Sequence, residues 1–250
     1  APYAELQITT NFSFLRGASH AAELVEQAKA LGLSAIGVAD RNTLAGVVRA
    51  HIAAKEHGLK LLAGARLDLV CGLSLLCYPE TRAAYGRLSA LISLGKMKAP
   101  KGECHLTLAD VMGAADGQCF IAIPPEEPDA AFEAVLSRLG ASWPGRGWER
   151  IARLDALGRR TGVPIVAVND VLYHAPERRP LQDVMSCIRE HCTIDQAGFR
   201  LQPHAERHLK SPAEMARLFA GFEAALARTQ HIAARCTFSL DELRYEYPDE

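Results

Sequence analysis

The chain has 250 residues, of which 49% are hydrophobic and 23% are charged, with a formal net charge of −1. This composition is typical of a globular protein with one α/β barrel or two smaller domains. It excludes a membrane-spanning chain, because no apolar run approaches the roughly 18 residues that a span needs. A near-neutral charge also argues against a principal DNA-binding surface.

The seven cysteines favour a reducing compartment. Their number is odd, and no two of them have the C-x-x-C spacing of a zinc or redox site. The first residues have neither the basic start nor the apolar stretch of a signal peptide. We therefore expect free thiols and a cytoplasmic protein without membrane contact.

In the first half of the chain, short apolar runs alternate with helical patterns. A strand around Leu6 and Ile8 precedes a helix that Ser19 caps and Gly32 ends. The pattern then predicts a strand at 35–38, a helix at 44–57, strands at 59–63, 66–70 and 73–78, and a helix at 81–92. The segment 94–105, with Lys96, Lys98 and Lys101 beside glycine and proline, is typical of a solvated loop.

The second half becomes increasingly helical. We expect a strand at 118–123, helices at 129–139 and 148–160, and a last strand at 164–168. Ser211, Pro212 and Glu214 form a strong helix start. Alternating units of this kind predict an α/β fold with a parallel sheet, and a closed or distorted barrel is favoured because no G-x-G-x-x-G fingerprint is present.

In such barrels, functional side chains gather where the strands end. Glu5 and Gln7 share one face of the first strand, since side chains two apart in a strand point the same way. The other polar or basic residues at expected strand ends and in the following loops are Arg16, Asp40, Arg41, Asn42, Arg66, Asn169, Asp170 and His174. Asp40 and Asp170 could equally be helix caps, and Asn169 could be a turn residue.

Five segments together resemble a known family across nearly the whole chain. They are the stretch from Asn11 to Ser19 and the segments 35–42, 61–66, 168–173 and 209–215. In this order they are similar to the amino-terminal polymerase-and-histidinol-phosphatase (PHP) domain of bacterial DNA polymerase III alpha subunits. The segments 98–104 and 243–248 are similar to the error-prone, damage-inducible branch of these polymerases.

The departures from the family pattern fall on its metal ligands. Where active members carry His-x-His, this chain has Glu5 and Gln7 around Leu6, and Arg16 replaces an acidic residue. Arg41 stands where a histidine follows Asp40, Arg66 where a glutamate belongs, and Leu172 where the last histidine belongs. Leucine cannot ligate, and arginines repel divalent cations, so the comparison predicts a pocket without metal or catalytic residues.

The resemblance implies a PHP-type distorted (β/α)7 barrel as the fold. It implies one PHP domain over 1–250, with a barrel core at about 1–200 and a helical extension at about 205–240 that leads to an absent polymerase region. The whole protein would then be a nucleotidyltransferase for translesion synthesis and DNA repair. Magnesium is expected only at the absent polymerase site, and the expected partners are the rest of the polymerase, DNA through the full-length protein, and other translesion-synthesis proteins.

The arginines also suggest a structural hypothesis. Arg16, Arg41 and Arg66 could take the place of the metals by pairing with Glu5, Asp40 and Asp170 as a salt-bridged plug. Two other functions remain open. One is a metal-dependent proofreading exonuclease or phosphoesterase that uses Asp40, Asp170, His174 and His20; the other is a module that binds phosphate or nucleic acid.

Overall fold

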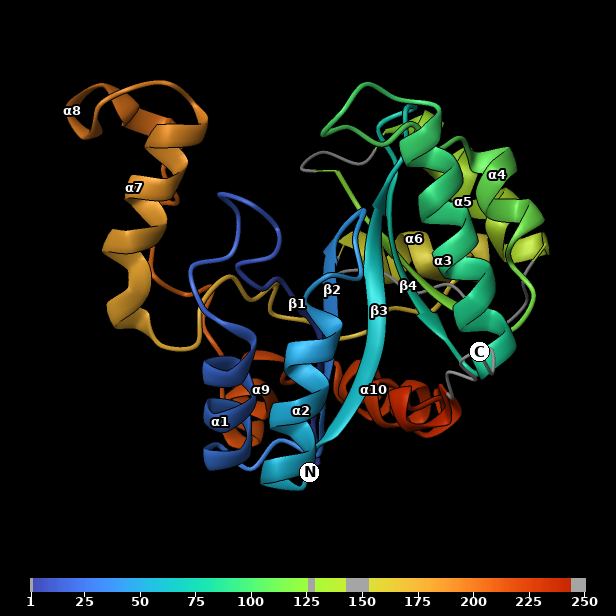
Figure 1. Cartoon of the computed structure of the whole chain (residues 1–250). Helices are drawn as coiled ribbons and strands as arrows, with labels where there is room; N and C mark the ends of the chain where they lie inside the picture. Colours follow the sequence, from blue (N-terminus) through green and yellow to red (C-terminus); the bar gives the residue numbers. More distant parts are fainter. Residues whose placement is uncertain (1, 126–128, 143–152, 244–250) are drawn as a thin grey trace, which may run out of the picture.

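The fold is built on one five-stranded sheet, seen in a computed structural model that describes residues 2–125, 129–142 and 153–243. The strands lie in chain order across the sheet: β1 (Ala4–Ile8), β2 (Ala35–Arg41), β3 (Lys60–Asp68), β4 (Ser74–Pro79) and β5 (Gln118–Ile123). The first three strands are parallel, whereas β4 and β5 are antiparallel to their neighbours. The described residues therefore form an α/β half-barrel (Figure 1).

The α/β class is confirmed, but the described part of the chain contains five strands rather than the seven units expected. The strand predicted at 164–168 is wrong. Ala167 donates its amide to Ala225 of a late helix, and only Val171 reaches β1, through an isolated parallel bridge with Ile8. The segment is extended and buried, which explains its strand-like pattern, yet its hydrogen bonds go to a helix.

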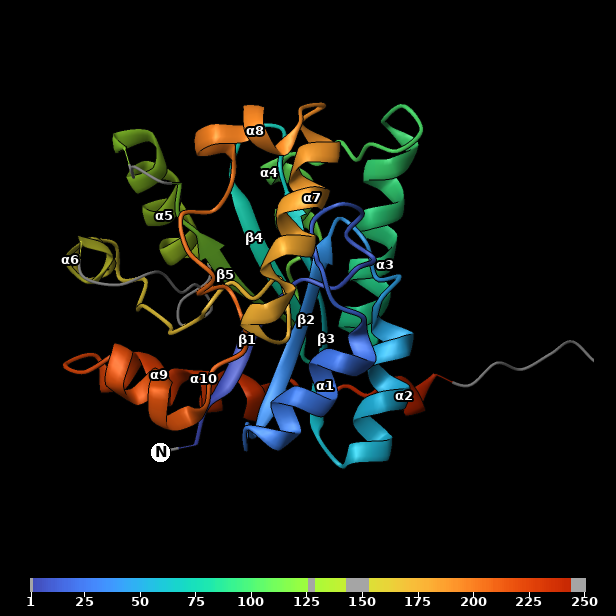
Figure 2. The same ribbon diagram turned by 90° about the vertical axis from the view of Figure 1, so that its left-hand side faces the viewer.

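Helices cover the sheet and project beyond it (Figures 1 and 2). The described α-helices are α1 (Ala21–Ala30), α2 (Val47–His57), α3 (Arg82–Met97), α4 (Leu108–Gly113), α5 (Ala130–Ser142), α6 (Arg153–Thr161), α7 (Arg179–Arg189), α8 (Ile194–Ala197), α9 (Pro212–Leu218) and α10 (Glu223–Arg235). The described 3-10 turns are η1 (Pro176–Arg178), η2 (Gly198–Arg200) and η3 (Leu240–Glu242).

Two helix boundaries differ from the sequence expectation. Helix α1 begins at Ala21 with His20 as its N-cap, because the Ser19 hydroxyl is engaged by His174 instead. Helix α3 continues to Met97 and so includes the first residues of the loop expected at 94–105. Gly95 packs closely against Cys104 and Leu106 there. The predicted start at Ser211 is confirmed, because its hydroxyl accepts the Glu214 amide at 3.2 Å.

The core lies between the sheet and its helices, and two helices lie apart from it. Helix α10 runs beneath the amino end of β1, where the Ala4 amide donates to Thr229 Oγ1 at 3.3 Å. Helices α7 and α8 project at the opposite end (orange in Figure 1). This arrangement leaves the carboxyl ends of β1, β2 and β3 facing the base of α7 (Figure 2).

Candidate functional site

The candidate site lies where the three parallel strands end. β2 and β3 run in register to their last paired residues, Arg41 and Arg66. Beyond β1, the loop from Thr9 to Arg16 curls over the same end, and its amide at Thr9 donates to Val171. The topology thus brings together segments from both halves of the chain, as expected for an α/β barrel.

Asp40 is fully buried beneath this loop. Its carboxylate accepts hydrogen bonds from the Thr10 amide at 2.9 Å, the Thr10 hydroxyl at 2.7 Å and the Ser13 hydroxyl at 2.7 Å. Burial raises the pKa of Asp40, although these hydrogen bonds oppose the shift. A side chain at Gly46 would clash with Asp40 and Thr10, so the close packing needs glycine there. Asp40 is therefore a loop anchor and not the cap of α2.

Arg41 and Arg66 share one carboxylate that the sequence analysis did not single out. Asp68 binds Arg41 Nη1 through Oδ2 and Arg66 Nε through Oδ1, both at 2.7 Å. The Ser74 hydroxyl donates to the same Oδ1 at 2.6 Å. Burial alone would raise the pKa of Asp68, but Arg66, Ser74 and Arg41 outweigh it and the pKa is lowered. The triad is thus a charged cluster at the mouth of the site.

Asp170 pairs with a second unexpected residue, Arg207. The Arg207 guanidinium binds the Asp170 carboxylate and also donates to its main-chain oxygen at 3.0 Å. Asp170 has a φ of 49°, a left-handed conformation that aspartate tolerates better than most residues. Next to it, Leu172 is buried and contributes no polar atom.

Glu5 is held by neutral groups below the mouth. It accepts hydrogen bonds from the Tyr3 hydroxyl at 2.6 Å, the Gln7 amide at 2.8 Å and the Asn169 amide at 3.0 Å. Burial raises its pKa to about 7. The Gln7 side chain is also buried, and its Nε2 has no hydrogen-bond partner among the described residues.

Above these carboxylates lies a small cavity of about 210 Å³, which we call the arginine pocket. Thr9, Asp170, Leu172 and Gln182 line it together with six arginines: Arg16, Arg41, Arg66, Arg189, Arg200 and Arg207. Burial and the nearby Arg66 and Arg16 lower the pKa of Arg41 to about 10, so the guanidinium stays charged at neutral pH. The pocket is therefore strongly cationic.

The structure brings five of the residues expected at the site to the arginine pocket: Arg16, Arg41, Arg66, Asp170 and Leu172. Glu5, Gln7 and Asp40 are buried away from its lining. His174 lies aside, with Nδ1 2.8 Å from the Ser19 hydroxyl.

The proposed plug was right about pairing in general and wrong about the partners. Arg41 and Arg66 pair with Asp68, and Asp170 pairs with Arg207. The Arg16 guanidinium makes no hydrogen bond or ion pair with any residue that the structure describes, although the Arg16 amide donates to the Ser13 carbonyl. Glu5 and Asp40 lie too deep to meet a guanidinium, so main-chain amides and hydroxyls satisfy them instead.

The residues present do not fit a metal centre. Two of the strand-end positions are guanidiniums engaged by Asp68, and Leu172 offers no donor. Across residues 2–125, 129–142 and 153–243, no group of three or more histidine, cysteine, aspartate or glutamate side chains is arranged to hold an ion. Divalent metals need such neutral or anionic donors.

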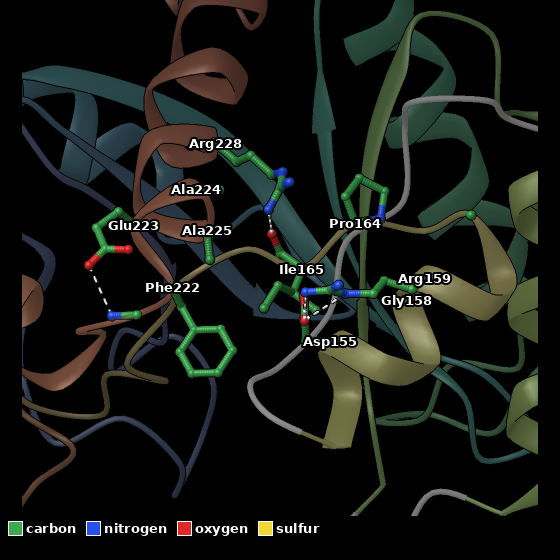
Figure 3. Close-up of a pocket in the computed structure, with 12 residues that line it drawn as sticks. Asp155, Gly158, Arg159, Pro164, Ile165, Phe222, Glu223, Ala224, Ala225 and Arg228 are labelled. Carbon is green, nitrogen blue, oxygen red and sulfur yellow. Dashed lines mark hydrogen bonds and ion pairs between the residues drawn. The ribbon is translucent and has the colours of Figure 1, made fainter.

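A larger cavity, of about 550 Å³, lies between α6 and α10 (Figure 3). Its polar groups are already paired: Arg159 with Asp155, Arg228 with the Ile165 carbonyl, and Glu223 with the Gly221 amide. It lies away from the strand ends and brings no set of reactive side chains together. The arginine pocket is therefore the better candidate.

Comparison with known proteins supports this fold. The solved structure of an amidohydrolase from Chromobacterium violaceum, which holds sulfate and no metal, superimposes with a TM-score of 0.54 at 13% identity, covering 68% of this chain and 88% of that one. A putative metal-dependent phosphoesterase from Bifidobacterium adolescentis gives a TM-score of 0.53 at 17% identity, covering 68% and 87%. At such identities the likeness shows the fold alone.

Residues 5–117 match the model of the PHP domain family. The chain as a whole corresponds to the amino-terminal quarter of error-prone DNA polymerases. It is 56% identical to the error-prone DNA polymerase of Caulobacter vibrioides and 49% identical to error-prone DNA polymerase 1 of Agrobacterium fabrum. Each match covers 99% of this chain and 24% of the relative, so the chain spans about a quarter of their length.

Proposed function

We propose that this chain is the PHP region of an error-prone DNA polymerase for translesion synthesis and DNA repair, and that the region does not itself hydrolyse phosphoesters. The observation that carries the second part is the cluster of Arg41, Arg66 and Asp68 at the strand ends. A fixed pair of guanidiniums occupies the positions where the family resemblance expects metal ligands.

The electrostatics support this proposal. A divalent cation beside either guanidinium would be repelled by several kcal/mol at a low effective dielectric constant. Asp68 could offset part of that repulsion, but its two oxygens already bind Arg41 and Arg66. Activation of water by a metal also needs an open coordination position on a firmly held ion. The cluster provides neither the ion nor the position.

An exposed apolar surface on α7 supports a structural role. Leu181, Val184 and Ile188 follow one another at helical spacing and are between 43% and 55% exposed, and Phe199 beyond α8 is fully exposed. Apolar surface of this kind usually marks an interface. Since the chain spans only a quarter of its relatives, the rest of the polymerase is the partner that we propose for it.

The remaining properties of the whole protein follow from the same proposal. Magnesium would serve the polymerase site outside this chain, and DNA and other translesion-synthesis proteins would be bound by the full-length protein in the cytoplasm. In the part of the chain that the structure describes, no helix is both long and apolar enough to cross a membrane.

Metal analysis combined with activity assays tests the proposal. We expect neither this chain nor the full-length polymerase to retain stoichiometric manganese or zinc at the PHP site. Exonuclease and phosphatase activity of the chain should stay at background with either metal added. Asp170→Ala is the informative variant, and Asp116→Ala, at an exposed aspartate, is its control. Stoichiometric metal, with activity that only Asp170→Ala abolishes, would overturn the proposal and identify a nuclease.

A further inference from the structure

The arginine pocket holds more positive charge than the surrounding carboxylates neutralise. Six guanidiniums line it, whereas Asp170 is the one acidic residue of its lining. Outside the lining, Asp68 is shared by Arg41 and Arg66, and Glu190 binds Arg189. Three carboxylates thus face six cations, and all three are already engaged.

Many donors in this pocket remain available for a ligand. Each guanidinium has five N–H donors. Arg41 uses one of them, with Asp68. Arg66 uses two, with Asp68 and with the Ser74 hydroxyl at 3.0 Å, and Arg207 uses two, both with Asp170. Arg16 uses none with any described residue, although burial and the nearby Arg189 lower its pKa. An anion would relieve this repulsion between cations.

A buried polar atom at the pocket wall lacks a partner as well. Gln182 is 3% exposed and lines the pocket, and its Oε1 accepts no hydrogen bond from the described residues. Buried side-chain amides are rarely left unpaired. Because Oε1 is an acceptor, its partner must be a donor, such as a water molecule or the hydroxyl of a monoprotonated phosphate, and not a bare anionic oxygen.

The size of the pocket limits that group. Its volume of about 210 Å³ is below the roughly 300 Å³ at which sites for drug-sized molecules begin. A single tetrahedral anion suits this volume, and arginine is the side chain best matched to phosphate oxygens.

A groove of about 880 Å³ adjoins the pocket and shares Arg16 and Arg41 with it. Phe12 and Phe14 line the groove and are 40% and 82% exposed. Lys96 and Lys101 lie along the same groove. Exposed aromatic rings beside basic side chains are the usual means of binding single-stranded nucleic acid, through base stacking and backbone contacts.

We propose that the arginine pocket binds a phosphoryl group, and that this group is the terminal phosphate of a single nucleic-acid strand whose first bases lie in the adjoining groove. The groove leads away from the pocket past Phe12 and Phe14. Carboxylates near this path are engaged: Asp68 by the two arginines and Glu103 by His105. The proposal stands on the pocket and does not depend on the polymerase assignment.

Fluorescence anisotropy tests this binding directly. The probe is a short oligothymidylate labelled at its 3′ end, with or without a 5′ phosphate, titrated with this chain and with the full-length polymerase. We expect the phosphate to strengthen binding roughly tenfold, the effect of one good charge-assisted contact. Arg16→Ala should remove that increment and lower the salt dependence by about one counterion.

Control variants distinguish binding in the arginine pocket from a general effect of positive charge on the protein. Arg217→Ala on α9 removes the same charge from an exposed arginine that pairs with Glu214 and lines neither the pocket nor the groove. It should leave the phosphate increment intact. Phe14→Ala should weaken both probes by a similar factor and keep the increment, and Arg16→Lys should restore part of it. Thermal melting of each variant confirms that it is folded.

Inorganic phosphate distinguishes the source of the anion. If free phosphate binds the chain and Arg16→Ala abolishes this, while the oligonucleotide end adds no affinity, the pocket is a phosphate site and the nucleic-acid part is overturned. If neither probe nor free phosphate responds to Arg16→Ala any more than to Arg217→Ala, the whole proposal is overturned.

Discussion

Two pairs of carboxylates, brought by the fold to the same end of the sheet, behave in opposite ways at this site. Glu5 and Asp40, at the floor, are almost fully buried and accept hydrogen bonds from amides and hydroxyls. Asp68 and Asp170, at the mouth, are partly exposed and bind guanidiniums. The pKa is raised for both floor residues and lowered for Asp68.

The comparison shows that the burial of a carboxylate and the groups that it contacts decide whether it is held by neutral donors or by arginines. At the floor, burial disfavours charge, and neutral donors hold the side chain as a structural anchor. At the mouth, arginines stabilise the charged form and are themselves held in place. A site that the family resemblance expects to hold metals is thus divided into a hydrogen-bonded floor and an ion-paired rim.

The largest effect is expected from removing a floor anchor. Asp40→Ala leaves the Thr10 amide and two hydroxyls without their acceptor in a buried position. We expect a loss of about 3–4 kcal/mol in the free energy of unfolding, measured by urea denaturation. The exposed control Asp116→Ala should show no measurable change. A loss equal to that of the control would mean that the loop does not depend on Asp40.

A second test uses pH to separate floor from mouth. The pKa of Glu5 is about 7 in the folded chain, above the value of about 4.3 in unfolded chains, so the folded state binds the proton more tightly. The contribution of protonated Glu5 to the free energy of unfolding is complete below pH 4 and is lost as the pH rises through 7. That change amounts to about 3–4 kcal/mol. Glu5→Gln cannot titrate.

From pH 5 to pH 8 the unmodified chain should therefore lose stability relative to Glu5→Gln. The free energy of unfolding of the variant minus that of the unmodified chain should rise over this range. Urea denaturation at several pH values measures it. A difference that stays constant with pH would show that Glu5 is ionised throughout and that the floor is not distinct from the mouth.

At the mouth, Asp68→Asn should cost about 1–2 kcal/mol, because Arg41 and Arg66 lose their shared carboxylate while remaining partly solvated. The pKa of Asp68 is lowered, so its contribution is present above the unfolded value of about 3.9 and is lost as the pH falls below it. The loss should therefore shrink in acid, opposite to the Glu5 effect. Equal losses at pH 3 and pH 7 would contradict the ion-pair account.

The smallest effect is expected at Asp170. Arg207→Gln removes the ion pair but keeps a polar side chain, and we expect a loss of about 1 kcal/mol that diminishes in high salt. Thermal denaturation at low and high ionic strength measures it. Arg217→Ala, at an exposed pair, should show a smaller salt effect.

The sequence pattern was enough to predict that Glu5, Asp40, Arg41 and Arg66 lie on strands or at their ends, but not the register that pairs Arg41 with Arg66. Asp68 could also have been found, since it lies two residues after Arg66 on the same face of β3. The part that spacing could not show is Arg207. It reaches Asp170 from an irregular segment that has no periodicity to place it.

The buried extended segment at 164–168 was misassigned for a related reason. Apolar periodicity reports burial, but it does not report which backbone groups form hydrogen bonds. Ala167 pairs with α10, whose position depends on the whole chain.

The parallel bridge between Ile8 and Val171 joins residues that lie far apart in the sequence, and Leu172 in turn donates its amide to Arg207. During synthesis, β1 is made well before the segments that carry Val171 and Arg207, so its outer edge lacks these partners until they emerge. Contacts between such distant residues form slowly because a long chain must close on itself. The first strand and its buried Glu5 are therefore synthesised long before Asn169 and Val171, the residues that complete their surroundings.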